Sequence, residues 1–387
     1  MVDTPVALGT GRKLRLGMVG GGRDAFIGAV HRIAARLEDR YDLVAGCLSS
    51  DPSRAAASAA DLRLPADRSY ADYEAMAREE AGRIDVVAIV TPNHLHVPVA
   101  RAFLAQGIDV ICDKPLSATL AEARALREAV ASAGVIFALT YNNTGHAMVR
   151  HAREMVAAGA LGDIRVVQAE YAQDWLALPI ERDGHKQASW RLDPARSGVG
   201  GCISDIGTHA FNLAAYVTGQ TPTEVCAELS RFVGGRALDD DASVMLRYGS
   251  GARGTLWASQ VATGCENALS LRVYGSKGGL EWRQEQPNEL IVSELGRAQR
   301  RLTKGGPESG PAARHATRTP AGHPDGYLDA FATIYADAAE LILARREGRA
   351  PNPLATTVPG IAEGMAAMRF VDAAVNSSAA GGVWTAT

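Results

Sequence analysis

Short apolar runs alternate with amphipathic stretches along the first 141 residues of the chain. The runs are rich in β-branched residues, and the stretches, such as residues 121–134, repeat their apolar positions at the period of a helix. Strands that alternate with helices are typical of a parallel sheet. We therefore predict an α/β, Rossmann-type domain over residues 1–141. Its expected strands are 14–19, 41–48, 86–90, 109–114 and 135–141.

After Tyr141 the pattern changes. A helical stretch at 148–159 and another after Ser204 are followed by strand-like runs with no helical pattern between them. Successive strands of this kind predict an open, mainly antiparallel sheet in an α+β domain over residues 142–387, whose C-terminal helices can pack back on the first domain. The expected strands are 223–229, 243–249, 254–261, 268–275 and 290–295.

Residues 300–348 contain a predicted loop followed by a predicted helix. Residues between Arg300 and Gly326 are rich in Gly, Pro and Arg, which predicts a loop. The following stretch from Tyr327 has helical periodicity and stops at Gly348, so it is expected to form a helix with a glycine stop.

Composition narrows the class of function. The chain has 387 residues, is 47% hydrophobic, and balances 40 basic against 43 acidic residues, for a net charge of -3. It therefore shows neither the basic footprint of a nucleic-acid binder nor a polybasic membrane patch, and we expect a small-molecule partner. Its five cysteines lack C-x-x-C spacing, which favours a reducing cytoplasm over a disulfide framework or a zinc site.

The first 13 residues lack the apolar core of a signal peptide, and no run approaches the roughly 18 apolar residues that a membrane helix needs. We expect this leader to be a frayed end and the protein to have no membrane partner.

A glycine-rich turn follows the first strand. Gly20–Gly22 are consecutive, and the next glycine is Gly28, three residues later than the G-x-G-x-x-G dinucleotide fingerprint allows. The required context is present, because an apolar strand precedes the turn and a helical pattern from Phe26 to Leu37 follows it. Gly20 is expected to make the tight turn and Gly22 to let the backbone approach a pyrophosphate, while Gly28 or Ala25 takes the third, packing position.

The end of the second predicted strand bears on the choice of cofactor. A dinucleotide site usually has an acidic residue there that binds the adenine ribose. If Ser49 takes that place, Ser49, Ser50 and Arg54 are suited to hold the 2'-phosphate of NADP, whereas Asp51 keeps NAD open. A helix cap at Asp51 is an equally good interpretation and is compatible with either cofactor.

Candidate site residues also follow the third and fourth strands. Thr91, Pro92 and Asn93 lie at the carboxyl edge of the sheet, where ligands bind in open α/β folds. Lys114 follows the fourth strand and precedes a proline, and its ammonium is suited to hydrogen-bond a reacting oxygen beside a cofactor. His94 and His96 have no third ligand at a characteristic spacing, so we assign no metal.

Asp205 and His209 lie four residues apart in a stretch, residues 204–219, that is predicted to be a helix. This spacing places both side chains on one face. Oxidation of a secondary alcohol removes the hydroxyl proton, and an imidazole beside a carboxylate can accept it. A surface Asp/His pair without function is the alternative interpretation.

Taken together, these motifs resemble the Gfo/Idh/MocA family of NAD(P)-dependent oxidoreductases. The resemblance runs in order over nearly the whole chain. It rests on Gly28-Ala-Val-His31, Thr91-Pro92-Asn93 with His96, Asp113-Lys114-Pro115, and Asp205-Ile206-Gly207-Thr208-His209.

The resemblance implies roles for these residues. The fingerprint is stretched, with Gly28 as its third glycine and Arg23 to Ala25 in an enlarged loop. The segment from Thr91 to Asn93, with His96, is expected to contact the nicotinamide side of the cofactor. Lys114 corresponds to the family's Glu-Lys-Pro lysine, with Asp113 in place of the glutamate.

In the second half, the resemblance makes His209 the catalytic acid/base and Asp205 a substrate-binding and orienting residue, with Lys114 across the cleft. It also implies a homodimer or homotetramer built through the antiparallel sheet, because an open apolar sheet face must be covered.

Further residues are candidates for substrate binding. Tyr141 and Asn142 end the last Rossmann strand, although the family's usual arginine pattern is replaced here by Asn142-Asn143-Thr144-Gly145-His146. Aromatic and hydrogen-bonding residues suit a sugar ring. The loop-rich stretch before the catalytic helix and a later loop supply such residues: Asp174, Trp175, His185, Trp190, Arg191 and His323.

The sequence therefore predicts an NAD(P)-dependent dehydrogenase that oxidises a ring secondary hydroxyl of a cyclic polyol, sugar or glycoside to a ketone. One alternative is an enzyme that holds its NAD tightly and recycles it during glycoside cleavage or epimerisation. Another is a non-catalytic dinucleotide or sugar sensor, which the presence of Lys114, Asp205 and His209 together disfavours. The sequence does not identify the substrate.

Overall fold

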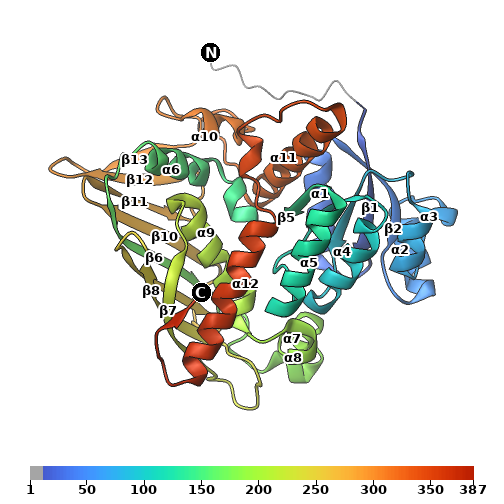
Figure 1. Cartoon of the computed structure of the whole chain (residues 1–387), viewed down its shortest axis with the longest axis horizontal. Helices are drawn as coiled ribbons and strands as arrows, with labels where there is room; N and C mark the ends of the chain where they lie inside the picture. The colour runs from blue at the N-terminus through green and yellow to red at the C-terminus, as the bar shows by residue number, and fades with distance from the viewer. Residues whose placement is uncertain (1–11) are drawn as a thin grey trace.

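Two β-sheets lie side by side, one in each half of the molecule (Figure 1). The structure is a computed structural model and describes residues 12–387. The predicted frayed leader therefore falls largely outside the described residues. A parallel sheet forms the first half and a mainly antiparallel sheet the second, which confirms the predicted fold class.

The first sheet has five parallel strands in the order β2-β1-β3-β4-β5. Its strands are β1 (Leu14–Gly20), β2 (Tyr41–Cys47), β3 (Val86–Val90), β4 (Asp109–Cys112) and β5 (Phe137–Leu139). The helices between them are α1 (Phe26–Leu37), α2 (Pro52–Asp61), α3 (Tyr73–Glu79), α4 (His96–Leu104) and α5 (Leu120–Ala133). From β1 the chain adds β2 on one side, and it then adds β3, β4 and β5 on the other side. Ligands bind beside the point where the strand order changes in this way, here between β1 and β3.

Both faces of this sheet are buried, which explains why its strands are continuous apolar runs. In β3, Val86 and Ala88 belong to a core shared with α1 and the C-terminal helix α11 (Tyr327–Glu347), whereas Val87 and Ile89 belong to a core shared with α4 and α5. Helix α11 therefore packs back on the first sheet.

The second sheet has nine strands in the order β13-β12-β11-β10-β6-β9-β8-β7-β14, and only the β6 to β9 pair is parallel. The strands are β6 (Ile164–Ala172), β7 (Pro222–Ser230), β8 (Asp241–Tyr248), β9 (Arg253–Ser259), β10 (Ala268–Gly275), β11 (Gly278–Arg283), β12 (Glu289–Glu294), β13 (Arg300–Thr303) and β14 (Thr385–Ala386). The helices are α6 (Ala147–Ala157), α7 (Lys186–Arg191), α8 (Pro194–Ser197), α9 (Thr208–Thr218), α10 (Pro311–His315), α11 and α12 (Ile361–Ala379).

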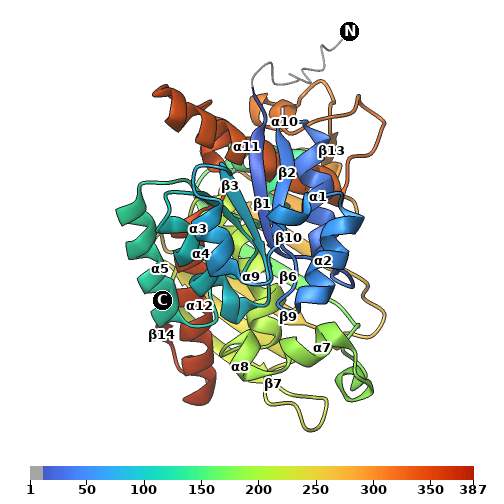
Figure 2. The same cartoon turned by 90° about the vertical axis from the view of Figure 1, so that its right-hand side faces the viewer.

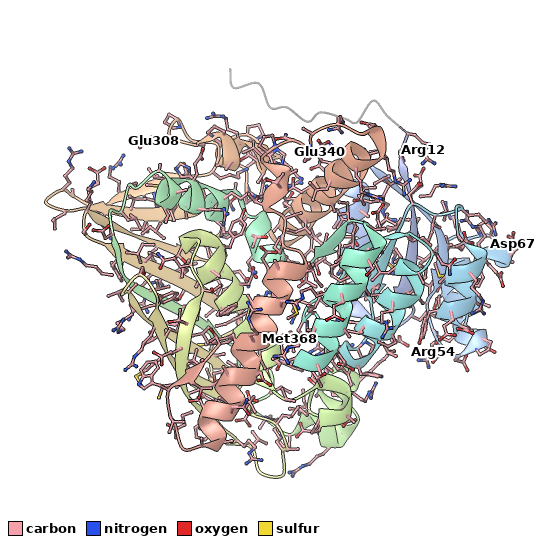
Figure 3. The ribbon with its side chains drawn as sticks, viewed as in Figure 1. Arg12, Arg54, Asp67, Glu308, Glu340 and Met368 are labelled. Carbon is pink, nitrogen blue, oxygen red and sulfur yellow. The ribbon has the colours of Figure 1, made fainter. Side chains whose placement is uncertain are left out.

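Helix α12 runs between the two halves, where Figure 3 marks Met368 near the centre of the molecule. It contacts both α5 of the first half and β7 of the second. The short helices α7 and α8 lie beneath the first sheet in both Figure 1 and Figure 2, so a segment of the second half approaches the carboxyl edge of the first.

Some element predictions need correction. The predicted loop between Arg300 and Gly326 contains strand β13 and helix α10, because its apolar positions pack although Gly, Pro and Arg surround them. Three strands end two residues before their predicted ends: β4 at Cys112, β5, expected to reach Tyr141, at Leu139, and β9 at Ser259. Among the described residues, no helix has both the length and the apolar character that a membrane crossing requires.

Candidate active site

The glycine turn after β1 is built by backbone conformation and by a close approach to α1. Gly20 and Gly21 have φ of +83° and +72°, in the left-handed region that side chains rarely adopt. A Cβ atom at Gly28 would lie 2.3 Å from the Cα of Gly21. The structure therefore packs α1 directly onto the turn at Gly28, in the third-glycine position of the fingerprint.

The extra residues of the fingerprint form a turn that is tied to α2. The backbone nitrogen of Arg23 donates to Oγ of Ser58 (3.1 Å), and its Nε donates to Oδ2 of Asp61 (2.6 Å). The backbone nitrogen of Ala25 donates to the carbonyl of Gly22 (3.1 Å). Helix α1 starts immediately afterwards at Phe26, so the three added residues lie before the helix and leave its packing intact.

A cavity of about 900 Å³ opens at the carboxyl edge of the first sheet, where β1 and β3 end. This volume lies within the range of small-molecule sites, roughly 300–1,000 Å³. The bare backbone of the glycine turn faces it, which fits a dinucleotide. The predicted cofactor residues that line it are Gly20, Gly22, Arg23, Ser49, Ser50, Arg54, Thr91, Pro92, Asn93, Asp113 and Lys114.

At the β2 end of this cavity, the carboxylate of Asp51 caps a helix. Oδ1 of Asp51 accepts from the backbone nitrogen of Arg54 (2.7 Å) and caps α2, and Asp51 does not line the cavity. Ser49, Ser50 and Arg54 do line it; Figure 3 marks Arg54 at the lower edge of the first half. Two hydroxyls and a guanidinium thus face the place where an adenine ribose is expected.

The turn after β3 is held from both sides. His96 is buried, and its two ring nitrogens lie 2.7 Å from the carbonyl oxygen of Pro115 and 2.9 Å from that of Thr91. Asn93 donates through Nδ2 to the carbonyl of Ser197, at the end of α8 (2.9 Å). His96 thus contacts the turns at Thr91 and Pro115, but it does not itself line the cavity.

The ammonium of Lys114 reaches across to the second half of the molecule. Its Nζ donates to Oδ1 of Asp205 (2.8 Å) and to the backbone carbonyl of the same residue (2.7 Å). Oδ2 of Asp205 accepts from Nε2 of Gln260 (2.9 Å) and lies 3.3 Å from Nε of Arg191. Burial alone would raise the pKa of Asp205, but the charges of Lys114 and Arg191 outweigh it and hold the pKa well below its usual range.

Asp205 lies in a π-helical turn, Ile203–Gly207, that leads directly into α9. The expected helix is therefore present with a local widening at the site. Single π-helical turns are frequent at functional sites.

His209, in the first turn of α9, is buried between the rings of Tyr141 and Tyr171, whose centroids lie 5.7 Å and 5.9 Å from its own. Its Nδ1 has no hydrogen-bond partner among the described residues. Burial, reinforced by the nearby charge of Lys114, lowers the pKa of His209 well below 6.5, although Asp205 opposes this. The imidazole is therefore neutral at neutral pH and able to accept a proton.

A second cavity, of about 400 Å³, meets the first at these residues. Lys114, Arg191 and Asp205 line both cavities, whereas His209 and Asn142 line only the second. A dinucleotide-sized space and a smaller space thus converge on one ammonium, one carboxylate and one neutral imidazole. That arrangement suits transfer of a hydride and a proton from one carbinol group.

The structure gives other predicted substrate residues different surroundings. Tyr141 is fully buried behind His209 and lines neither cavity. Trp190 lines only the first cavity, where the guanidinium of Arg191 lies 4.2 Å from the centre of its ring. Trp175 and His185 line the second cavity, whereas Asp174 and His323 line neither.

Sequence reasoning missed several residues that line or hold the site. Gln260 follows β9, Tyr171 and Gln173 come from the end of β6, and Gln187 lies in α7. None belongs to a motif, so their only signal was a place near a strand end or within the loop-rich stretch.

Comparison with known proteins places the chain. The model described as "Oxidoreductase family, NAD-binding Rossmann fold" matches residues 14–141, and that of the "GFO/IDH/MocA C-terminal domain" matches residues 149–281. The chain belongs to the Gfo/Idh/MocA family. This member is thus an oxidoreductase with an NAD-binding Rossmann domain.

Solved structures of related proteins align over 97% of this chain. An oxidoreductase from Sinorhizobium meliloti is 49% identical over 99% of its own chain, with a TM-score of 0.87. An inositol dehydrogenase homolog from Azotobacter vinelandii, complexed with NAD+, is 35% identical over 98% of its chain, with a TM-score of 0.92. A levoglucosan dehydrogenase in complex with NADH and levoglucosan is 26% identical over 99% of its chain, with a TM-score of 0.82.

Proposed function

We propose that this oxidoreductase reversibly oxidises a ring secondary hydroxyl of a cyclic polyol, sugar or glycoside to a ketone. The observation that carries the proposal is the neutral imidazole of His209, whose Nδ1 has no hydrogen-bond partner among the described residues and which lies beside the Lys114–Asp205 pair where the two cavities meet. Relatives that are named as acting on inositol or levoglucosan support a carbohydrate or polyol substrate.

Each of the three residues has a role in this reaction. His209 accepts the hydroxyl proton, and Lys114 hydrogen-bonds the oxygen as it becomes a carbonyl. Asp205 holds the ammonium of Lys114 in place and binds the substrate. A bound nicotinamide dinucleotide supplies the acceptor for the hydride that leaves the carbinol carbon.

Both NAD and NADP remain candidates for this chain. Relatives crystallised with NAD+ or NADH favour NAD. Ser49, Ser50 and Arg54, which line the cavity while Asp51 caps α2, favour acceptance of a 2'-phosphate. The assay must therefore include both cofactors.

The proposal includes a homodimer or homotetramer in the cytoplasm. Val166, Met245 and Tyr274 are exposed on the outer face of the second sheet, and a second copy would cover them. All five cysteines are free thiols, as expected in a reducing compartment. Light scattering tests the assembly, and a monomer would contradict it.

To test the reaction, the purified protein is assayed with inositols, monosaccharides and glycosides in the presence of NAD+ or NADP+. Formation of reduced cofactor is followed by its absorbance. We expect production with a subset of cyclic substrates, and none above background with the His209→Ala variant prepared in parallel. Absence of production with every substrate, despite intact cofactor binding, would contradict a dehydrogenase. Cleaved or epimerised product without net NADH would instead indicate the recycled-cofactor enzyme.

A further inference from the structure

The second cavity has two chemically different ends. Its charged residues, Asp113, Lys114, Arg191 and Asp205, are all shared with the first cavity. The residues that line the second cavity alone include no Lys, Arg, Asp or Glu. They are aromatic, amide, hydroxyl, imidazole and aliphatic side chains. The surface that the second cavity does not share with the first is therefore suited to an uncharged ligand.

Two exposed aromatic side chains lie at this uncharged end. Phe26 is the first residue of α1 and Tyr327 the first residue of α11, and 70% and 40% of their surfaces are exposed. The two helices pack against each other, and both rings line the second cavity. Phe331, one turn further along α11, is buried and meets the ring of Tyr327 edge-on, with centroids 5.0 Å apart. A single exposed aromatic residue is ordinary, but two on one cavity wall form a surface that a ligand can cover.

The enlarged glycine turn supplies Phe26 to this wall. The added residues 23–25 are anchored by the Arg23–Asp61 ion pair and by the hydrogen bond from Ala25 to Gly22, so the start of α1 is fixed. Phe26 then lines the second cavity and not the first, whereas the next residue, Ile27, lines both. Binding of a dinucleotide does not require the three residues added to the fingerprint. These residues thus place the aromatic ring of Phe26 at the second cavity.

We propose that Phe26 and Tyr327 form a subsite for a second, uncharged sugar ring, so that the preferred substrate is a glycoside of the ring that is oxidised. This inference rests on the proposed dehydrogenase function. The apolar face of a pyranose packs on aromatic rings, while its hydroxyls need hydrogen-bonding partners. His185, Gln173 and Asn142 line the same cavity and offer such partners. The volume of about 400 Å³ leaves room beyond one six-membered ring.

The test compares each cyclitol or monosaccharide that the enzyme oxidises with a glycoside that carries a second glucosyl ring, and with the matching phenyl derivative. The readouts are kcat/KM and, independently of turnover, the Kd of each compound for the enzyme loaded with oxidised cofactor, measured by titration calorimetry. The variants are Phe26→Ala and Tyr327→Ala. Leu295→Ala is the control, because Leu295 is 82% exposed and lines neither cavity.

The wild type is expected to prefer the glycoside over the free ring by about 3- to 10-fold for each aromatic contact in both kcat/KM and Kd. Phe26→Ala and Tyr327→Ala should each lose the share of one contact, about 3- to 10-fold, and Leu295→Ala should keep the full preference. Equal values for glycoside and free ring in the wild type, or a preference that survives both alanine variants, would overturn the subsite. A stronger preference for the phenyl derivative would overturn its assignment to a sugar.

The two proposals can fail separately. If no compound is oxidised but glycoside binding still depends on Phe26 and Tyr327, the proposed reaction is wrong and the subsite stands. If free rings are oxidised and bound as well as their glycosides, the reaction stands and the subsite is wrong.

Discussion

The two ends of strands β3 and β4 lie near acidic residues in contrasting surroundings. At the amino end, Asp85 precedes β3 and Asp109 begins β4, and both are fully buried. Asp85 accepts from the backbone and side chain of Arg15 and pairs with Arg346, while Asp109 pairs with Arg345. Both arginines lie in the last turn of α11, so these ion pairs hold that helix on the sheet.

At the carboxyl end, Asp113 follows β4 and the next residue, Lys114, pairs with Asp205 of the other half. Here two cavities converge, and one ring nitrogen of His209 has no partner among the described residues. Ion pairs occur at both ends, so they do not by themselves mark a site. The carboxyl end differs in its access from solvent and in a buried polar atom that has no hydrogen-bond partner among the described residues.

Replacement of Lys114 by alanine should have the largest effect on activity. The variant lacks the donor to the reacting oxygen, and loss of such a donor costs about 10²- to 10³-fold in turnover. Arg191 and Gln260 still hold Asp205, so the fold should persist. Steady-state kinetics measures the loss, and circular dichroism checks the fold. Turnover within threefold of the wild type would show that Lys114 has no catalytic role.

Replacement of Asp85 by alanine should lower the stability of the fold and leave the activity of the folded protein unchanged. Removal of one partner of a buried ion pair costs about 3–5 kcal/mol, and we expect about 3 kcal/mol because the arginines left behind are partly exposed. Urea unfolding measures the free energy, with Asp67→Ala, an exposed site marked in Figure 3, as control. Activity per folded molecule should match the wild type. A loss of turnover without a loss of stability would contradict the separation of the two ends.

The pH dependence should separate the two ends further. Because the pKa of His209 is well below 6.5, the imidazole stays neutral as pH falls through 6.5. The value of kcat/KM for oxidation should therefore begin to fall only below pH 6.5. Burial alone would raise the pKa of Asp85, but hydrogen bonds from Arg15 and the charge of Arg346 depress it. Its stabilising contribution is thus fully present above about pH 3.9 and is lost as pH falls through the lower folded pKa.

Circular dichroism at the same pH values shows whether the protein stays folded where the acid limb is measured. An acid limb with a midpoint at or above 6.5 would contradict a depressed pKa at His209.

Replacement of Gln260 by leucine should have the smallest effect. It removes one hydrogen bond to Oδ2 of Asp205, worth roughly 1.5–3 kcal/mol when the acceptor is charged, or about 10- to 150-fold in kcat/KM. The Kd of the cofactor should not change, because Gln260 does not line the first cavity. Fluorescence titration and steady-state kinetics give the two quantities. An altered Kd with normal turnover would place Gln260 on the cofactor instead.

The sequence was sufficient wherever local periodicity decides the structure. The pattern from Phe26 to Leu37 predicted α1, and the glycine stop of α11 is present at Gly348, which has the left-handed φ of +64°. It failed for β13 and α10, because their few apolar positions become informative only once they pack on neighbours distant in the chain. Sheet order likewise depends on pairing between distant strands.

The candidate site divides in the same way. Strand ends placed Lys114 and the glycine turn at one edge, because parallel strands share their direction. The contact of Asp205 with Gln260 and the burial of Tyr141 behind His209 depend on how the two halves pack, which local sequence does not encode. Phe26 was visible only as a helix start, since its exposure follows from the packing of α1 on α11.

The central claim is that His209 accepts the substrate proton at the carboxyl end of the first sheet. It is tested most directly by the single-turnover rate of cofactor reduction for the wild type and His209→Ala, with the best substrate saturating and the Kd of oxidised cofactor measured for both. The account predicts a rate at least about 10²-fold lower in the variant with an unchanged Kd. An unchanged rate in a correctly folded His209→Ala protein would contradict it.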